Sequence, residues 1–116
     1  MRNFKKLLIW IKGMELVDLL YESASHFPDS EKFGLRSQVL SAGVSIPSNI
    51  AEGSAKRSPK DYVRYLTTSL GSAYELETQL LIIEKRKWFP EDLIARLLEL
   101  TEEEQKMISA FIDRVS

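Results

Sequence analysis

The sequence predicts an all-α protein, an antiparallel up-and-down four-helix bundle that forms one domain over residues 1–116. Apolar residues recur at steps of three and four along most of the chain, which is the period of a helix. Four such segments are separated by proline or capping residues, and short connections favour antiparallel neighbours. A length of 116 residues fits one domain, and an apolar content of 44% is enough for a core.

The first helix is predicted over about residues 3–26. Its apolar stripe includes Phe4, Leu7 and Leu8, and Pro28 ends it because the residue before a proline disfavours helical backbone. Gly13 lies in the interior and costs about 1 kcal/mol relative to alanine at an exposed position.

The second helix is predicted over about residues 35–52 and contains Pro47. A proline there removes a backbone donor and clashes with the carbonyl of Gly43, at a cost of about 3 kcal/mol in a regular helix. We therefore expect helix two to be kinked at Pro47, or to break near residues 43–47. Gly53 follows as a candidate C-cap.

The third helix has the clearest start in the chain. Ser58 is a good N-cap residue, Pro59 suits the first helical position, and Asp61 lies three residues after the cap. This helix continues to about Arg86, and the fourth opens around Pro90 with acids in its first turn.

Apolar residues also lie outside the stripe that each helix needs for one core. Extra apolar surface indicates a second buried face, and hence a homo-oligomer. The alternative is that a small bundle simply exposes some aromatic residues. The residues concerned are Ile9, Trp10, Leu40, Val44, Tyr62, Tyr65 and Tyr74.

The composition excludes several classes of function. The chain has no cysteine, which rules out disulfide scaffolds, zinc ribbons and thiol nucleophiles. The single histidine, His26, excludes a multi-histidine metal site, and isolated glycines exclude a phosphate-cradling loop. We therefore expect no enzyme, no metal and no cofactor.

The longest apolar run near the start, residues 7–11, is far shorter than the roughly 20 residues that span a bilayer. Basic residues precede it, but it is also too short for a signal peptide. We expect a cytoplasmic chain with no membrane partner.

The formal net charge is −1, but the charges are distributed unevenly. Cations gather in residues 1–13, in residues 54–64 and at residues 85–87, whereas residues 91–104 are strongly acidic. Such runs usually mark solvated helix faces. The more specific interpretation is a phosphate-binding patch at the start of the third helix. Its candidate residues for nucleic-acid binding are Lys56, Arg57, Lys60 and Arg64.

A second group of polar residues is predicted to be structural. Glu77 falls on an apolar stripe, so its carboxylate needs a partner or an edge position. Candidate partners are Asn49 and Ser45, or an arginine of a neighbouring subunit. Together with Glu52 they would form a polar network around Pro47 that fixes helix register, and we favour this over a catalytic role.

Two stretches resemble a known family. They are residues 45–53, which read SIPSNIAEG, and residues 70–80, which contain LGS and ELETQL. They are similar to four-helix bundle proteins encoded in intervening sequences of bacterial 23S rRNA genes, over almost the whole chain. The resemblance implies a homopentameric ring, with RNA association suggested by the genetic setting. It also extends to the accessory variability determinant of diversity-generating retroelements, which binds nucleic acid through a basic pentamer surface.

The chain departs from that family where basic residues commonly follow Gln38, because Leu40 and Ser41 stand there. Lys56, Arg57 and Arg64 match basic positions of the family. The first hypothesis is a non-enzymatic homo-oligomer with an RNA or ribonucleoprotein role. The second is a protein–protein interaction scaffold without nucleic acid, and the third is a hydrolase that uses buried carboxylates.

Overall fold

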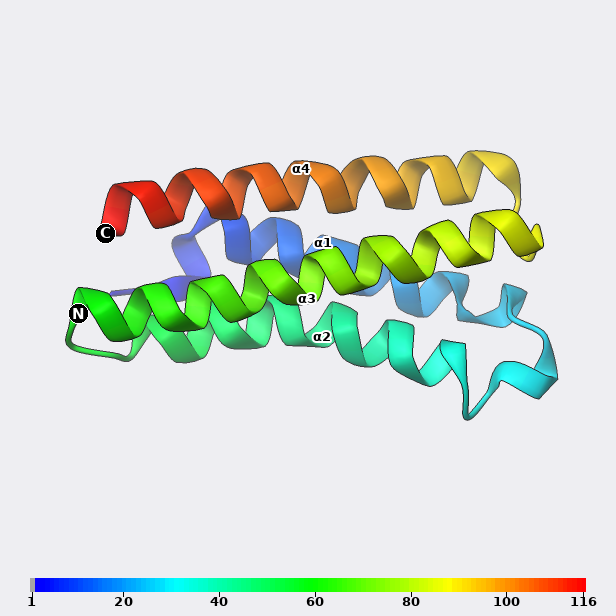
Figure 1. Ribbon diagram of the computed structural model, residues 1–116, viewed down its shortest axis with the longest axis horizontal. Helices are drawn as coiled ribbons and strands as arrows, with labels where there is room; N and C mark the ends of the chain where they lie inside the picture. Colours follow the sequence, from blue (N-terminus) through cyan, green and yellow to red (C-terminus); the bar gives the residue numbers. More distant parts are fainter. Residues whose placement is uncertain (1) are drawn as a thin grey trace.

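The amphipathic segments form four α-helices in a computed structural model that describes residues 2–116. They are α1 (Leu8–Ser23), α2 (Leu35–Ser54), α3 (Pro59–Arg86) and α4 (Glu91–Val115). Short 3-10 turns occur at η1 (Phe4–Lys6), η2 (Ala24–His26) and η3 (Asp29–Glu31), and residues 2–116 contain no strand. Successive helices run in opposite directions, so both chain ends lie at one end of the molecule (Figure 1). The predicted all-α, four-helix class is confirmed.

The first helical segment is interrupted near its start, where one continuous helix was predicted. Asn3 caps η1 by accepting a hydrogen bond from the Lys5 backbone N–H at 3.2 Å. Leu7 then adopts an extended conformation, and α1 begins only at Leu8. The chain before Leu7 therefore leaves the line of α1.

The second helix is continuous through Pro47 and ends two residues later than predicted. The predicted break does not occur, and a kink at Pro47 stays a prediction. Gly53 is not the C-cap: Ala55 caps α2, and Gly53 is buried within the helix. The reason is tertiary, because Gly53 lies where α2 meets α3, and a Cβ there would be 2.7 Å from the Tyr65 Cβ.

The start of α3 is confirmed. The Ser58 hydroxyl accepts a hydrogen bond from the Asp61 backbone N–H at 3.1 Å, and Pro59 is the first helical residue. At the far end Lys87 adopts a left-handed conformation, with φ of 59°, and caps α3.

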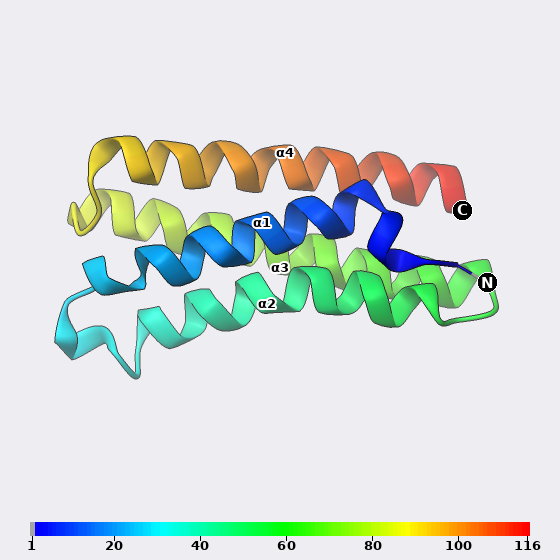
Figure 2. The same cartoon turned by 180° about the vertical axis from the view of Figure 1, so that it is seen from behind.

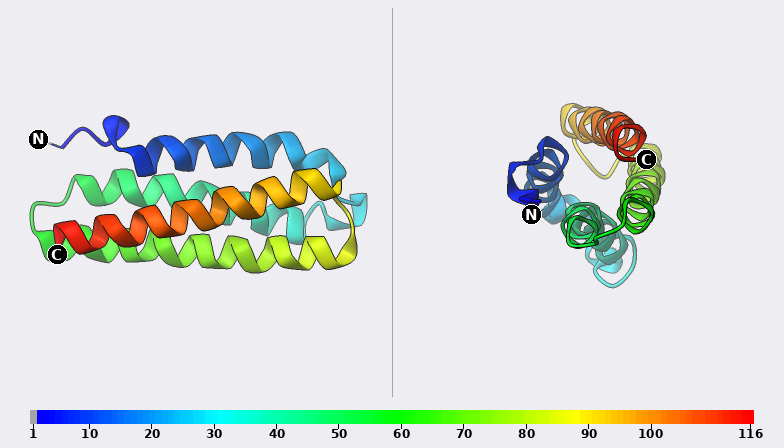
Figure 3. Two further views of the ribbon diagram at one scale, coloured as in Figure 1. Left: turned by 90° about the horizontal axis from the view of Figure 1, so that it is seen from above. Right: turned by 90° about the vertical axis from the view of Figure 1, so that its left-hand side faces the viewer.

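The four helices surround one apolar core. An end-on view shows them at four corners, with α2 between α1 and α3 (Figure 3), and from behind α1 lies between α4 and α2 (Figure 2). Contacts are densest between α2 and α3 and between α3 and α4, and sparser between α1 and α4. The largest fully buried apolar side chains are Leu16, Leu20, Ile46, Ile50, Tyr62, Leu66, Leu76, Leu80, Ile83, Leu97 and Ile108.

Two of the residues predicted to form extra apolar surface belong to the core instead. Tyr62 is 1% exposed and Ile9 is 4% exposed. Tyr62 precedes Leu66 by four residues, so it shares the core stripe of α3, and its ring packs edge-on against Phe111 at 5.9 Å. Tyr74 and Val44 do remain exposed, and Trp10, Leu40 and Tyr65 are half-buried.

Candidate nucleic-acid interface

The four predicted phosphate-binding residues flank the turn between α2 and α3. Lys56 and Arg57 lie in the turn, and Lys60 and Arg64 lie on the first two turns of α3. The Lys56 backbone N–H donates to the Gly53 carbonyl at 3.0 Å, which holds the turn against the end of α2. The structure thus brings these residues together at the end of the bundle where both termini lie (Figure 1).

The cations of this turn are only lightly neutralised. The Arg64 guanidinium is 3.5 Å from the Asp61 carboxylate, a pair that is exposed and therefore weak. Lys56 and Arg64 also lie over the Tyr65 ring, 5.0 and 5.6 Å from its centroid. Arg57 and Lys60 are exposed and form no ion pair within residues 2–116. Positive charge therefore remains available to an external anion.

Arg2 joins this site from the other end of the sequence. Its Nη1 donates to the Ser54 carbonyl at 3.1 Å and also to the Lys56 carbonyl, so it satisfies carbonyls that the end of α2 leaves unpaired. Its guanidinium lies 4.4 Å from the centroid of the Tyr62 ring. Burial raises the pKa of the Tyr62 hydroxyl, and the charge of Arg2 partly offsets that rise.

A hollow of about 750 Å³ lies between the N-terminal segment and the end of α2. Cationic side chains line it on both sides, from Arg2 on one segment and from Lys56 and Arg57 on the other, and Phe4 adds an aromatic wall. We call this hollow and the four predicted residues the basic end. A concave surface with several cations and an aromatic side chain is chemically suited to a phosphate backbone and its bases.

The other charged clusters lie elsewhere. Residues 85–87 are exposed at the opposite end of α3, so they do not add to the basic end. Most acids of α4 are exposed, as a solvated face requires, but Glu104 is not. It is 1% exposed and belongs to the core, which corrects its assignment to that face.

The predicted polar network divides into separate groups. The Asn49 side-chain amide donates to the Ser45 hydroxyl and to the Ser45 carbonyl, both at 2.9 Å. The Ser45 hydroxyl is 2.8 Å from the Ser72 hydroxyl of α3. These bonds link α2 to α3 within one turn of Pro47.

Glu77 and Glu52 lie outside that group. Gln105 of α4 donates to the Glu77 carboxylate at 2.8 Å and to the Ala73 carbonyl at 3.3 Å, so Glu77 links α3 to α4. Glu52 is exposed. Gln105 was missed because it follows the acidic run of α4, although its place eight residues after Leu97 puts it near the core stripe.

Residues 2–116 contain no group of three or more His, Asp or Glu side chains placed to hold a metal ion. In the same residues, no helix combines the length and the apolar content that crossing a bilayer requires.

Fold and surface together define an all-α four-helix bundle with a basic end. The family of 23S rRNA-intervening sequence proteins matches residues 5–110, and the chain belongs to this family. It is also similar to a crystal structure of a protein of unknown function from the S23 ribosomal protein family of Bacteroides thetaiotaomicron. The two are 21% identical with a TM-score of 0.84, over 90% of this chain and 98% of that one. No curated protein matches the chain.

Proposed function

We propose that this protein is a non-enzymatic, cytoplasmic homo-oligomer, a pentameric ring by family resemblance, that binds structured RNA through its basic end. The observation that carries the proposal is the convergence of Arg2, Lys56 and Arg57 on one hollow, with Lys60 and Arg64 beside it. Only Arg64 among these five is paired with a carboxylate within residues 2–116.

Self-association is supported by apolar surface on two different edges of the bundle. On one edge, Trp10 and Met14 of α1 and Val44 and Pro47 of α2 line a hollow of about 360 Å³. On α3, Tyr74 is 54% exposed, and exposed Leu81 and Ile82 follow it on the same face. Contacts between two unlike surfaces are heterologous, and such contacts close into rings when the rotation permits.

A ring would strengthen weak binding. One chain offers a modest number of cations and has a formal net charge of −1. Phosphate contacts depend on their number, because each neutralised phosphate releases counterions. Repetition of the basic end around a ring would present several such sites to one RNA and raise its effective affinity.

The test is a filter-binding titration of the full chain against a structured RNA at two salt concentrations. We expect binding that weakens as salt rises, and the variant with Arg57→Ala and Arg64→Ala should bind more weakly with a shallower salt dependence, by about one unit of log–log slope per lost phosphate contact. The matched control is Lys85→Ala with Lys87→Ala, which removes the same charge at the opposite end and should bind as the wild type does.

The alternative function is a protein–protein interaction scaffold. Absence of binding at low salt would contradict the RNA proposal and favour the scaffold. Equal loss of binding in both double variants would show that charge matters only non-specifically, and it would remove the basic end from the proposal.

A further inference from the structure

Three residues that break the rules of local structure meet at one point in the core. Gly13 is inside α1, Pro47 is inside α2, and Glu104 lies on the buried face of α4. A Cβ built on Gly13 would be 3.0 Å from Oε2 of Glu104 and 3.5 Å from the Cβ of Pro47. The Glu104 carboxyl thus lies against α1 where a glycine leaves space for it. Violations of local preference that converge in this way mark strained or functional positions.

The Glu104 carboxyl is buried without a partner. The side chain is 1% exposed, and neither carboxyl oxygen has a hydrogen bond within residues 2–116. Nearby polar groups of α4 are satisfied, since Thr101 donates to the Leu97 carbonyl at 2.7 Å and Gln105 donates to Glu77 at 2.8 Å. An unpaired carboxylate in such a place is very costly, so the closed bundle holds this carboxyl in its neutral form.

The charges around Glu104 do not provide a counter-ion inside the core. Burial raises its pKa to about 8, the charge of Glu103 adds to the rise, and Lys12 of α1 opposes it. Lys12 is itself 3.5 Å from Glu15. From α2 the neighbours at Gly13 are Pro47 and Ile46, which carry no charge, and on α3 Glu77 is engaged by Gln105.

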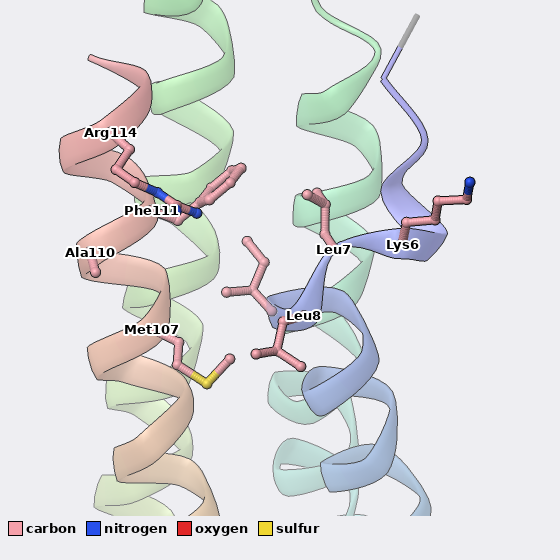
Figure 4. Close-up of a pocket in the computed structure, with 8 residues that line it drawn as sticks. Lys6, Leu7, Leu8, Met107, Ala110, Phe111 and Arg114 are labelled. Carbon is pink, nitrogen blue, oxygen red and sulfur yellow. The ribbon is translucent and has the colours of Figure 1, made fainter.

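The carboxyl lies at the seam between α1 and α4, where contacts between these helices are sparse. One helical turn away, this seam opens into a groove of about 510 Å³. Figure 4 shows Leu7 and Leu8 on one wall facing Met107 and Phe111 on the other. The groove exists because the chain before Leu7 leaves the line of α1 while α4 continues to Val115. Solvent thus approaches within about one turn of the buried carboxyl.

We propose that Glu104 is a proton-operated latch: its neutral form lets α1 pack against α4, and loss of its proton favours an open state in which α1 separates from α4 and the carboxylate reaches water. Opening along this seam leaves the more extensive α2–α3 and α3–α4 contacts in place. The latch therefore acts on one helix, α1.

The direction and the size of the pH effect on opening follow from the linkage between proton binding and conformation. The closed state binds the proton with a pKa of about 8, whereas a solvated glutamate has its ordinary value of 4.5. Within this window the ratio of open to closed molecules rises by up to tenfold per pH unit, and it levels off above the upper value. Between pH 5 and pH 8 the open population of α1 should increase by roughly two to three orders of magnitude.

The test is amide hydrogen exchange of the full chain between pH 5 and pH 8.5, corrected for the intrinsic pH dependence of exchange. We expect protection of the α1 amides to fall by that factor. At each pH their protection should be lower and less sensitive to urea than that of the central α3 amides, because opening of α1 exposes less surface than global unfolding. Glu104→Gln removes the titrating group without changing its shape, so its α1 protection should be nearly independent of pH. Glu103→Gln is the matched control on the exposed side of α4 and should retain most of the pH dependence.

Three results would overturn the latch. They are an α1 protection that stays flat with pH in the wild type, an equal pH dependence in Glu104→Gln, and α1 amides that match the central α3 amides in both protection and urea dependence. The last result would mean that α1 opens only by global unfolding. If Glu104→Gln fails to fold, carbon-13 NMR titration of the glutamate carboxyls in the wild-type chain decides. A carboxyl titrating near 8 supports the latch, and titration of every glutamate near 4.5 refutes it.

Discussion

The close approach of α2 to α3 depends on Gly53, and a single methyl group there should force the helices apart. A Cβ on Gly53 would be 2.7 Å from the Tyr65 Cβ, 3.2 Å from a ring carbon of Tyr62 and 3.4 Å from the Tyr62 carbonyl oxygen. Carbon atoms in van der Waals contact are separated by about 3.5–4.0 Å. The Tyr65 Cβ is attached directly to the backbone, so α3 itself has to move by about 1 Å.

Two opposing contributions set the change in unfolding free energy for Gly53→Ala. Overpacking of a well-packed core costs about 1–3 kcal/mol, and the replacement of an interior helical glycine by alanine gains about 1 kcal/mol. We expect the variant to lose up to about 2 kcal/mol of unfolding free energy. Gly71→Ala provides the matched control, because it changes a glycine inside α3 whose added Cβ would have no neighbour within 4 Å. That variant should gain up to about 1 kcal/mol.

The assay is thermal and urea unfolding of both variants beside the wild type. A change of 1 kcal/mol corresponds to roughly 4 °C in Tm for a domain of this size. Gly53→Ala should lower Tm, and Gly71→Ala should raise it. If both substitutions raise Tm by similar amounts, helix propensity alone governs Gly53 and the argument from close packing is refuted.

Further expectations concern stability and assembly. Because the pKa of the Glu104 carboxyl is raised, its contribution to stability is fully present below pH 4.5 and is lost as pH rises toward 8. The full shift of about 3.5 units corresponds to roughly 5 kcal/mol. Urea unfolding should therefore give a lower unfolding free energy at pH 8 than at pH 5, a difference that Glu104→Gln largely removes. Ser58→Ala deletes the hydrogen bond from Asp61 and should cost about 1 kcal/mol of unfolding free energy in urea titrations; an unchanged midpoint would contradict the role of the cap. Val44→Glu places a charge in the exposed apolar hollow beside Met14, so light scattering should report a lower mass than for the wild type, and an unchanged mass would exclude this edge as an interface.

Features set by neighbouring residues could be predicted from the sequence. The start of α3 is one of them, because Ser58, Pro59 and Asp61 act within a single turn. Gly53 shows the limit of such reasoning. Its sequence context is typical of a C-cap, but the residue is needed for a contact with Tyr65 on another helix, which local propensity does not describe.

From the sequence, Glu104 is placed on the solvated face of α4, because the run of acidic residues is given more weight than the position of Glu104 in the helical period. It ends a run of three glutamates, and such runs usually form a solvated face. Its position seven residues after Leu97 and four before Ile108 nevertheless places it on the core stripe of α4. The helical period, applied residue by residue, would have found the buried carboxyl.

The basic end was only partly predictable for a similar reason. Lys56, Arg57, Lys60 and Arg64 are close in sequence, so one turn brings them together. Arg2 reaches the Ser54 carbonyl across 52 positions of the chain, and that contact depends on how η1 turns away from α1.

The mass of the assembled protein tests most directly whether the basic ends are repeated around a ring. Sedimentation equilibrium of the full chain at micromolar concentration gives this mass without reference to shape. A value of several times the 13.3 kDa chain mass is expected, and five times for the pentamer. A single species of 13.3 kDa would contradict the ring and, with it, the multivalent binding of RNA.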